Sequence, residues 1–243
     1  MTQALFTGVP DGWEAATEER LARGVEITTT VLADPLVVDD VARYYDRGSN
    51  YAGATFLDVD PADPYAVTSG DLLALTLLSV QAEPQAVRRL LEMTATNREV
   101  RQLLTEEHLP LDADLSMADV DTLVAMAALH EAFKRALSLD RSQSKNPWVT
   151  ASKLCARKRP DLFPVRDSVV CDLLELSGRR QNYEVDWQVF RRIIQDEGVR
   201  TRLDTVVKEA GARDGVNVGH PNRRLRHLDV ALWMHAQRTS RTT

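Results

Sequence analysis

The chain has 243 residues, of which 44% are hydrophobic, and a formal net charge of −6. A chain of this length and apolar content can bury a full hydrophobic core, which excludes global disorder and favours one globular unit. No apolar run approaches the roughly 20 residues of a membrane-spanning helix, and residues 1–6 lack the basic start of a secretory signal, so we expect a soluble cytoplasmic protein. Its two cysteines, Cys155 and Cys171, form no zinc or disulfide pattern and are interpreted as buried thiols.

The charge is divided unevenly along the chain. Residues 1–120 contain 21 acidic and 8 basic residues, a balance of −13, whereas residues 121–243 contain 15 acidic and 22 basic residues, a balance of +7. One interpretation is an uneven but solvated surface. The other is a basic face that binds phosphate, with an acidic region elsewhere that limits indiscriminate binding.

Helical signals dominate the chain. The Asp34-Pro35 pair is typical of a helix start and predicts a helix over residues 36–45. Residues 50–59 carry aromatic and β-branched residues and predict a small N-terminal β element. We therefore expect a mainly α fold. Spacing and capping residues predict its other helices over residues 71–80, after Pro84, around residues 98–106, and over residues 120–137, 147–159 and 169–176. Further helices are predicted after a cap at Asp186, over residues 199–210 and from residue 222 onward.

Two segments resemble the helix-hairpin-helix DNA glycosylases, the superfamily that includes endonuclease III. The first is the predicted helix from Asp71, which ends in a Leu-Leu-Ser-Val-Gln run at Gln81. The second joins Thr150-Ala151 to a Pro-Val-Arg-Asp run that ends at Asp167, 17 positions after Thr150. The Ser-Lys-Leu…Lys-Arg-Pro…Phe-Pro-Val-x-Asp-Ser pattern is also similar to an actinobacterial family of unknown function. The resemblance implies a single two-lobed unit over residues 1–243, with residues 70–177 as a helical lobe and residues 1–69 plus 178–243 as the second.

The resemblance implies a monofunctional N-glycosylase-like protein that acts on nucleic-acid bases. Cleavage of an N-glycosidic bond develops positive charge on the sugar, which a carboxylate stabilises, and the base must enter a pocket outside the stack. Asp167 is the candidate catalytic carboxylate, although an Asp before an apolar helical run is also typical of a helix N-cap. The candidates for binding nucleic acid or substrate are Gln81, Lys145, Trp148, Lys153, Arg157 and Arg166.

The sequence departs from that superfamily in three places. The glycine hairpin that offers backbone amides to a DNA phosphate is replaced by Lys145, Asn146 and Pro147, and proline lacks an amide hydrogen. Val149 stands where lyase-competent members carry a lysine, which excludes Schiff-base chemistry at that position. No four-cysteine cluster is present, and the histidines form no metal pair, so no cofactor and no metal are expected.

These departures leave two alternatives open. One is a catalytically inactive module that binds nucleic acid or protein on the same fold. The other is an enzyme that acts on an acidic small molecule. The partner is accordingly DNA or another nucleic acid, a protein or a small molecule, and no membrane is expected.

Overall fold

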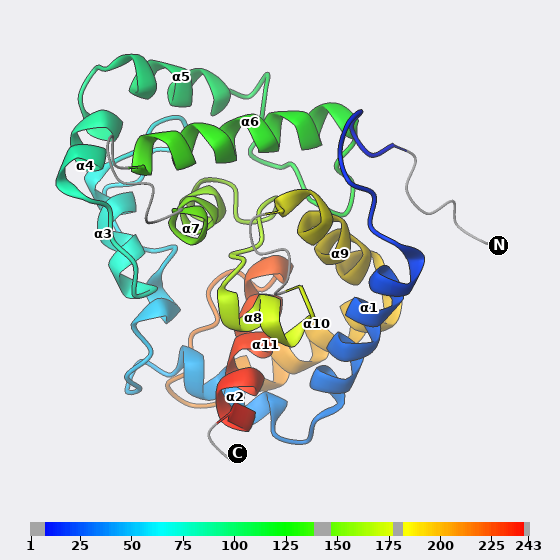
Figure 1. The fold of residues 1–243 in the computed structure, drawn as a ribbon. Helices are drawn as coiled ribbons and strands as arrows, with labels where there is room; N and C mark the ends of the chain where they lie inside the picture. The colour runs from blue at the N-terminus through cyan, green and yellow to red at the C-terminus, as the bar shows by residue number, and fades with distance from the viewer. Residues whose placement is uncertain (1–7, 139–146, 177–181, 241–243) are drawn as a thin grey trace.

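The computed structural model describes residues 8–138, 147–176 and 182–240, and it is built almost entirely from helices (Figure 1). In these ranges, no helix has the length and apolarity required to cross a membrane. The elements in chain order are α1 (Glu18–Ala33), α2 (Val37–Tyr45), the 3-10 helix η1 (Ala52–Thr55), α3 (Ser69–Leu77), α4 (Pro84–Leu91), α5 (Ala95–Leu103), α6 (Val120–Leu137), α7 (Trp148–Lys158), α8 (Ser168–Leu173), α9 (Tyr183–Gln195), α10 (Glu197–Gly211) and α11 (Arg224–Ser240).

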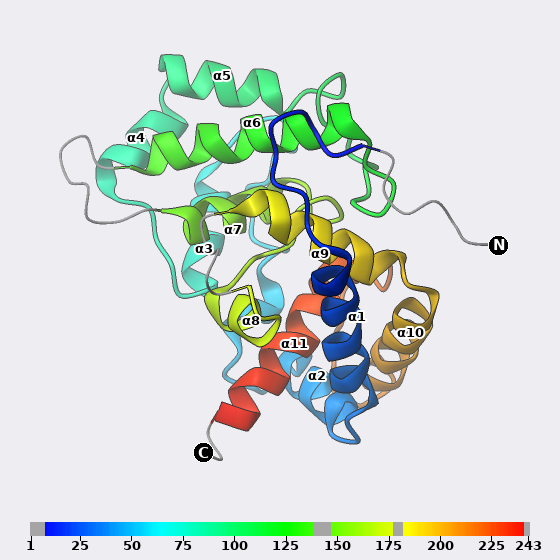
Figure 2. The ribbon, with the colours of Figure 1, turned by 45° about the vertical axis from the view of Figure 1, so that its right-hand side comes forward.

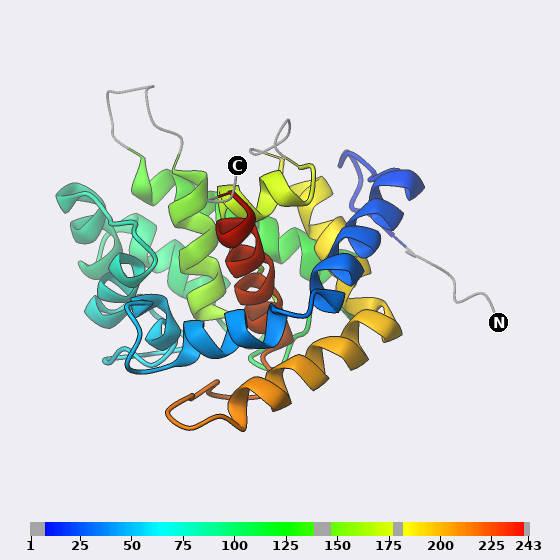
Figure 3. The same cartoon turned by 90° about the horizontal axis from the view of Figure 1, so that it is seen from below.

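The helices pack in two neighbouring groups that share one core. In the first group α6 packs on α5 and α7, and α3 packs on α7; in the second, α2 packs on α10 and α11, and α1 packs on α9 and α10. Figure 2 shows α5 and α6 side by side at one end of the molecule, with α1, α2 and α10 at the other. The short helix α8 packs on α11, which runs through the middle of the view in Figure 3. Buried apolar residues of both groups form one hydrophobic cluster, and the division into lobes at residue 70 and residue 177 stays a prediction.

Side-chain caps begin several of the predicted helices, at positions that the structure sets. The carboxylate of Asp119 accepts a hydrogen bond from the Thr122 amide at 2.8 Å and begins the 18-residue α6. Thr68 and Asp71 form a capping box at the start of α3, so two amide groups that the helix leaves unsatisfied find side-chain partners. The residues of α3 are apolar nearly all round, yet the helix is not buried all round: Leu75 is fully buried while Leu73 is 58% exposed.

Two sequence predictions about local structure are wrong. Residues 50–59 form the 3-10 helix η1 and turns, and within the described ranges the only β pairing is an isolated antiparallel bridge between Asp46 and Val216. Among the described residues no second strand pairs with this segment; Phe56 is buried in the core and Tyr51 is partly buried. Asp186 does not cap a helix: Asn182 caps α9, accepting a hydrogen bond from the Glu184 amide at 3.0 Å. Asp186 is fully buried inside that helix.

The two cysteines are buried and unpaired, as the sequence predicts. Cys155 lies on α7 and Cys171 on α8, and neither side chain is exposed to solvent. Burial raises the pKa of both thiols, which keeps them protonated and unreactive at neutral pH.

Candidate functional site

A cavity of about 580 Å³ lies where α2, η1, the end of α3, α7, α8 and α11 meet. This volume lies within the range of about 300–1,000 Å³ in which proteins usually bind small ligands. Its wall contains aromatic and charged residues. The aromatic residues are Tyr44, Tyr51 and Trp233, and the charged residues are Lys153, Asp167, Arg226 and Asp229.

Asp167 stands at the N-terminus of α8 and faces this cavity. Its Oδ1 accepts a hydrogen bond from the Val169 amide at 3.0 Å, so the carboxylate does cap the helix. Its Oδ2 forms an ion pair with Nζ of Lys153 at 3.0 Å, and the side chain is 22% exposed. The residue is therefore a helix cap and a cavity-lining carboxylate at the same time, and it is not sealed from solvent.

Lys153 connects Asp167 to the end of α3. Besides the ion pair, its ammonium group donates a hydrogen bond to the carbonyl of Leu78 at 2.9 Å. The cavity wall includes residues 76–80, so the two segments on which the sequence resemblance rests meet here. Ser79 in this turn has a φ of +59°, in the left-handed region that is unfavourable for a residue with a β carbon. Gln81, two residues later, is exposed and does not line the cavity.

Asp229 of α11 is a second carboxyl group in the cavity wall, and the sequence analysis did not identify it. The Val165 amide donates a hydrogen bond to its Oδ2 at 2.9 Å. The residue is 4% exposed, and burial, opposed mainly by the nearby Arg226, raises the pKa of its carboxyl to about 7. The sequence did carry a signal for Asp229: it is an acidic residue between the apolar Leu228 and Val230, on a helix predicted to be buried.

The aromatic residues of the cavity wall contact one another, and Tyr44 also contacts Arg226. The rings of Tyr44 and Tyr51 are stacked, with centroids 5.5 Å apart and an interplanar angle of 25°. Trp233 meets both edge-on, with centroids 6.2 Å from Tyr44 and 6.0 Å from Tyr51. The buried guanidinium of Arg226 lies 5.4 Å from the centre of the Tyr44 ring and donates to the carbonyl of Gly53 at 2.9 Å. Aromatic surfaces of this kind bind planar rings.

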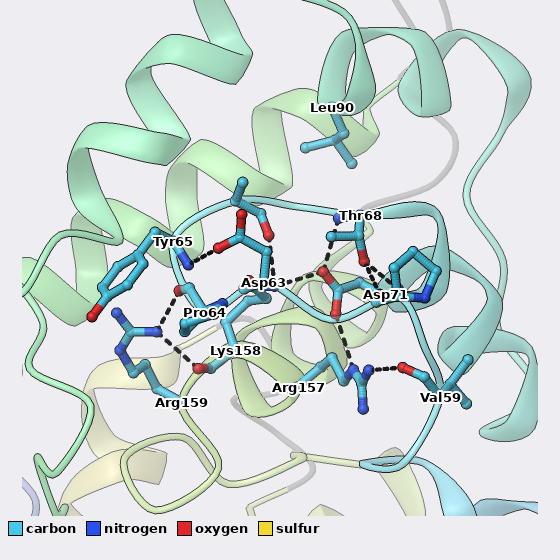
Figure 4. A network of polar contacts seen from close by, with 12 residues as sticks. Val59, Asp63, Pro64, Tyr65, Thr68, Asp71, Leu90, Arg157, Lys158 and Arg159 are labelled. Atoms are coloured by element: carbon cyan, nitrogen blue, oxygen red, sulfur yellow. Dashed lines mark hydrogen bonds and ion pairs between the residues drawn. The ribbon is translucent and has the colours of Figure 1, made fainter.

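Most of the basic residues near Asp167 lie inside the protein. Figure 4 shows Arg157, Lys158 and Arg159, at the end of α7, reaching into the chain segment before α3. Asp71 accepts from Arg157 Nε at 3.0 Å and from Lys158 Nζ at 2.6 Å, and the side chains of all three are at most 3% exposed. Arg159 donates to the Leu109 carbonyl at 2.8 Å and is 2% exposed. The predicted role of Arg157 in a surface patch is therefore replaced by a structural one, because its donors are engaged by buried acceptors.

Two further candidates also lie in the core. Arg166 is fully buried, and its Nε donates to Asp186 Oδ2 at 2.8 Å. Its guanidinium lies 5.0 Å from the centre of the Trp148 ring, and Trp148 is only 9% exposed, which leaves its ring unsuited to stacking on a ligand. Neither residue lines the cavity. Lys145 lies outside the described residues. Of the seven predicted site residues, the cavity thus brings together Asp167 and Lys153.

Comparisons with known proteins give a family and no function. No curated protein and no solved structure matches the chain. Residues 37–236 match a family of unknown function, DUF6308. The match begins at α2 and ends within α11, so it contains every helix that contributes to the cavity. The chain belongs to the DUF6308 family.

Proposed function

We propose that the protein is a monofunctional N-glycosylase-like hydrolase on a helix-hairpin-helix glycosylase-like architecture, and that it cleaves the bond between a nucleobase and its sugar in the cavity at Asp167. The observation that carries the proposal is the position of Asp167, a partly exposed carboxylate in the wall of a ligand-sized cavity. The meeting of the 76–80 turn with Lys153 at the same cavity supports it.

The proposed chemistry uses both the aromatic and the charged residues of the cavity wall. A base that stacks against Tyr51 or Trp233, which are less buried than Tyr44, would place its sugar toward Asp167. As the N-glycosidic bond breaks, positive charge develops on the sugar, and the carboxylate of Asp167 stabilises it. The ion pair with Lys153 holds that carboxylate in place and leaves its side chain partly accessible.

The size of the cavity and the burial of the basic residues restrict the substrate. A volume of about 580 Å³ accommodates one nucleoside unit rather than a stretch of strand. Because Arg157, Lys158, Arg159 and Arg166 are buried, they supply no surface for a phosphate backbone. The substrate is therefore either one nucleotide that leaves a strand or a free nucleoside. The second candidate function, an enzyme on an acidic small molecule, is favoured only by the size of the cavity and by the presence of Lys153 and Arg226 in its wall.

The test is base release by the wild type, by Asp167→Asn and by Asp112→Asn. Asp112 is exposed and lies outside the cavity, so it controls for the loss of one carboxylate. Lesion-bearing oligonucleotides and free nucleosides form separate arms. We expect release in one arm by the wild type and by Asp112→Asn, reduced about 100-fold or more in Asp167→Asn. No release in either arm, or equal release by all three proteins, would refute the proposal.

A salt titration of oligonucleotide binding separates the alternatives. A strand held through phosphates loses affinity as salt rises, with a slope that reflects the number of contacts. A nucleoside or another small molecule in the cavity shows little such dependence. Binding of oligonucleotides with a steep salt slope but no base release would favour the inactive nucleic-acid-binding module instead.

A further inference from the structure

Arg226 carries a buried positive charge that no carboxylate contacts directly. It lies on α11, is 8% exposed, and lines the cavity at Asp167. Its Nη2 donates to the Tyr44 hydroxyl at 2.5 Å and to the Gly53 carbonyl at 2.9 Å. Among the residues that the structure describes, Arg226 forms no ion pair, and Asp229 on the same helix interacts with it only electrostatically. Buried charges are rarely left unpaired, so this one in a cavity wall points to an anionic ligand.

The guanidinium of Arg226 also keeps hydrogen-bond donors that a ligand can reach. Its Nε and Nη1 have no acceptor in the part of the chain that the structure describes. Neither nitrogen is among the sealed polar atoms that lack a partner, a set that does include Oδ1 of Asp229. Both nitrogens are therefore accessible. The spaces beside Arg226 are the cavity at Asp167 and a second cavity of about 430 Å³.

Acidic residues make the second cavity the poorer site for an anion. Asp58 and Asp63 line its wall, and both would repel a negative group. Arg223 lines it as well, but its guanidinium is already ion-paired with Asp161. The anion that Arg226 attracts is therefore more stable in the first cavity.

The charges of the first cavity leave Arg226 without a full counter-charge. The carboxylate of Asp167 is balanced by Lys153 at 3.0 Å. The remaining acid in the wall is Asp229, and burial raises the pKa of its carboxyl to about 7, so part of it is uncharged at neutral pH. A negative group on a ligand would supply the charge that is missing.

We propose that Arg226 holds the phosphate of a ligand in this cavity, and that the ligand is a nucleoside monophosphate whose base lies against Tyr51 or Trp233. The nucleotide form of the ligand rests on the proposed function, whereas the anion site rests on Arg226 itself. A phosphate offers several acceptor oxygens to the open donors, and hydrogen bonds between a guanidinium and a phosphate are stronger than those between neutral groups. The cavity of about 580 Å³ has room for one such ligand. This narrows the proposed substrate to one that carries a phosphate.

The competing explanation is that Arg226 only ties α11 to Tyr44 and to the turn at Gly53. The two explanations differ in how the charge of the ligand affects its binding. The experiment measures the affinity of the wild type for adenosine, guanosine, cytidine and uridine 5′-monophosphates, for the matching nucleosides and for ribose 5-phosphate. Binding is followed by calorimetry at constant ionic strength, and the ligand is verified to be intact after each titration.

Three variants locate the site. Arg226→Gln removes the proposed anion receptor. Arg223→Gln removes an arginine that lines the second cavity and not the first. Arg101→Gln removes an exposed arginine that lines neither cavity, and it controls for the loss of one positive charge.

We expect at least one monophosphate to bind the wild type about 10- to 100-fold more tightly than its nucleoside. Arg226→Gln should reduce this preference to less than about 3-fold, and the other two variants should keep it. Equal binding of nucleoside and monophosphate by the wild type, or no binding of either, would overturn the assignment of Arg226. So would a preference that Arg226→Gln retains, or one that Arg223→Gln also abolishes. Ribose 5-phosphate should bind more weakly than the best nucleotide, and equal affinity would exclude the base from the site.

A further variant covers the case in which Arg226→Gln does not fold. Arg226→Lys keeps a buried cation but loses the planar set of donors, so its preference for the monophosphate should fall about 5-fold or more. An unchanged preference would count against the assignment. Base release, measured separately, distinguishes the two proposals. Base release without a preference for the monophosphate refutes the phosphate site and leaves the proposed function standing. A preference without base release refutes the proposed function and leaves the anion site standing.

Discussion

Replacing Asp229 by asparagine tests the buried carboxyl group without any ligand. An asparagine side chain has nearly the same shape and can still accept the hydrogen bond from the Val165 amide. It cannot ionise. The variant therefore removes the cost of ionising a buried carboxyl group and leaves the packing of α11 largely unchanged.

The size of the effect follows from the pKa of Asp229. An unfolded aspartate titrates near 3.9 and the folded one at about 7, a difference of about 3 units or about 4 kcal/mol. Because the folded state binds this proton more tightly, the wild type loses stability as the pH rises from about 4 and has lost the full amount above about 7. Asp229→Asn has no such loss. The stability of the variant relative to the wild type should therefore increase by about 2 kcal/mol between about pH 5.5 and about pH 8.

Urea unfolding at a series of pH values measures this difference. The free energy of unfolding of the wild type, Asp229→Asn and Asp112→Asn is extrapolated to zero denaturant at each pH. The exposed Asp112 controls for the removal of one surface carboxylate. We expect the free energy of unfolding relative to the wild type to rise with pH for Asp229→Asn and to stay constant for Asp112→Asn. A difference that stays constant to within about 0.5 kcal/mol across this range would refute the view that burial keeps Asp229 protonated.

Three further predictions concern other parts of the molecule. Asp71→Asn leaves Arg157 and Lys158 buried without their counter-charge and should lower the free energy of unfolding by about 3 kcal/mol or more; a loss below about 1 kcal/mol in urea would contradict this. Burial lowers the pKa of His227 to about 4, so the folded protein binds this proton less tightly than the unfolded chain. The free energy of unfolding therefore falls as the pH falls from about 6.5 toward 4. His227→Gln should reduce that fall by up to about 3 kcal/mol, measured by unfolding at successive pH values. Ser79→Gly relieves a φ of +59° and should stabilise by about 1 kcal/mol in thermal unfolding, while Ser79→Ala, which keeps the β carbon, should not.

The helices could be predicted because their signals are local. The apolar spacing from Val120 onward predicts α6, whose cap is Asp119 rather than the predicted Ser116, and Pro160 sets the end of α7. The strand at residues 50–59 could not be excluded in the same way, because a strand depends on a partner elsewhere in the chain. Asp186 shows the same limit: a carboxylate near a helix start is typical of a cap, and only tertiary packing places Arg166 beside it.

Only some of the cavity-lining residues could be predicted from the sequence. Asp167 and Lys153 lie in one resembling segment, so sequence comparison was enough to find them. The aromatic residues and Asp229 come from α2, from the residue before η1 and from α11, which the fold brings to α7 and α8 from far along the chain. The prediction that the basic residues form a surface patch failed for a related reason. Sequence shows the charges of Arg157 and Lys158 but not their acceptor Asp71, which lies 86 and 87 positions away.

The placement of Asp167 is controlled more tightly than a helix cap requires. A cap needs only that the Asp167 carboxylate reach the Val169 amide. Here each of the residues 165, 166 and 167 is held by a side chain from a different helix. The Val165 amide is held by Asp229 of α11, the Arg166 guanidinium by Asp186 of α9, and the Asp167 carboxylate by Lys153 of α7.

Arg166, in the middle of this turn, has a φ of +50°, a conformation that costs a residue with a β carbon about 1–2 kcal/mol. Strain of this kind persists only where several contacts determine the backbone together, and such positions cluster at functional sites. The buried Arg166 side chain, paired with Asp186, keeps this position from being a glycine. The observed arrangement directs one carboxylate to the cavity from a backbone that cannot relax, which supports a role for Asp167 that depends on its position.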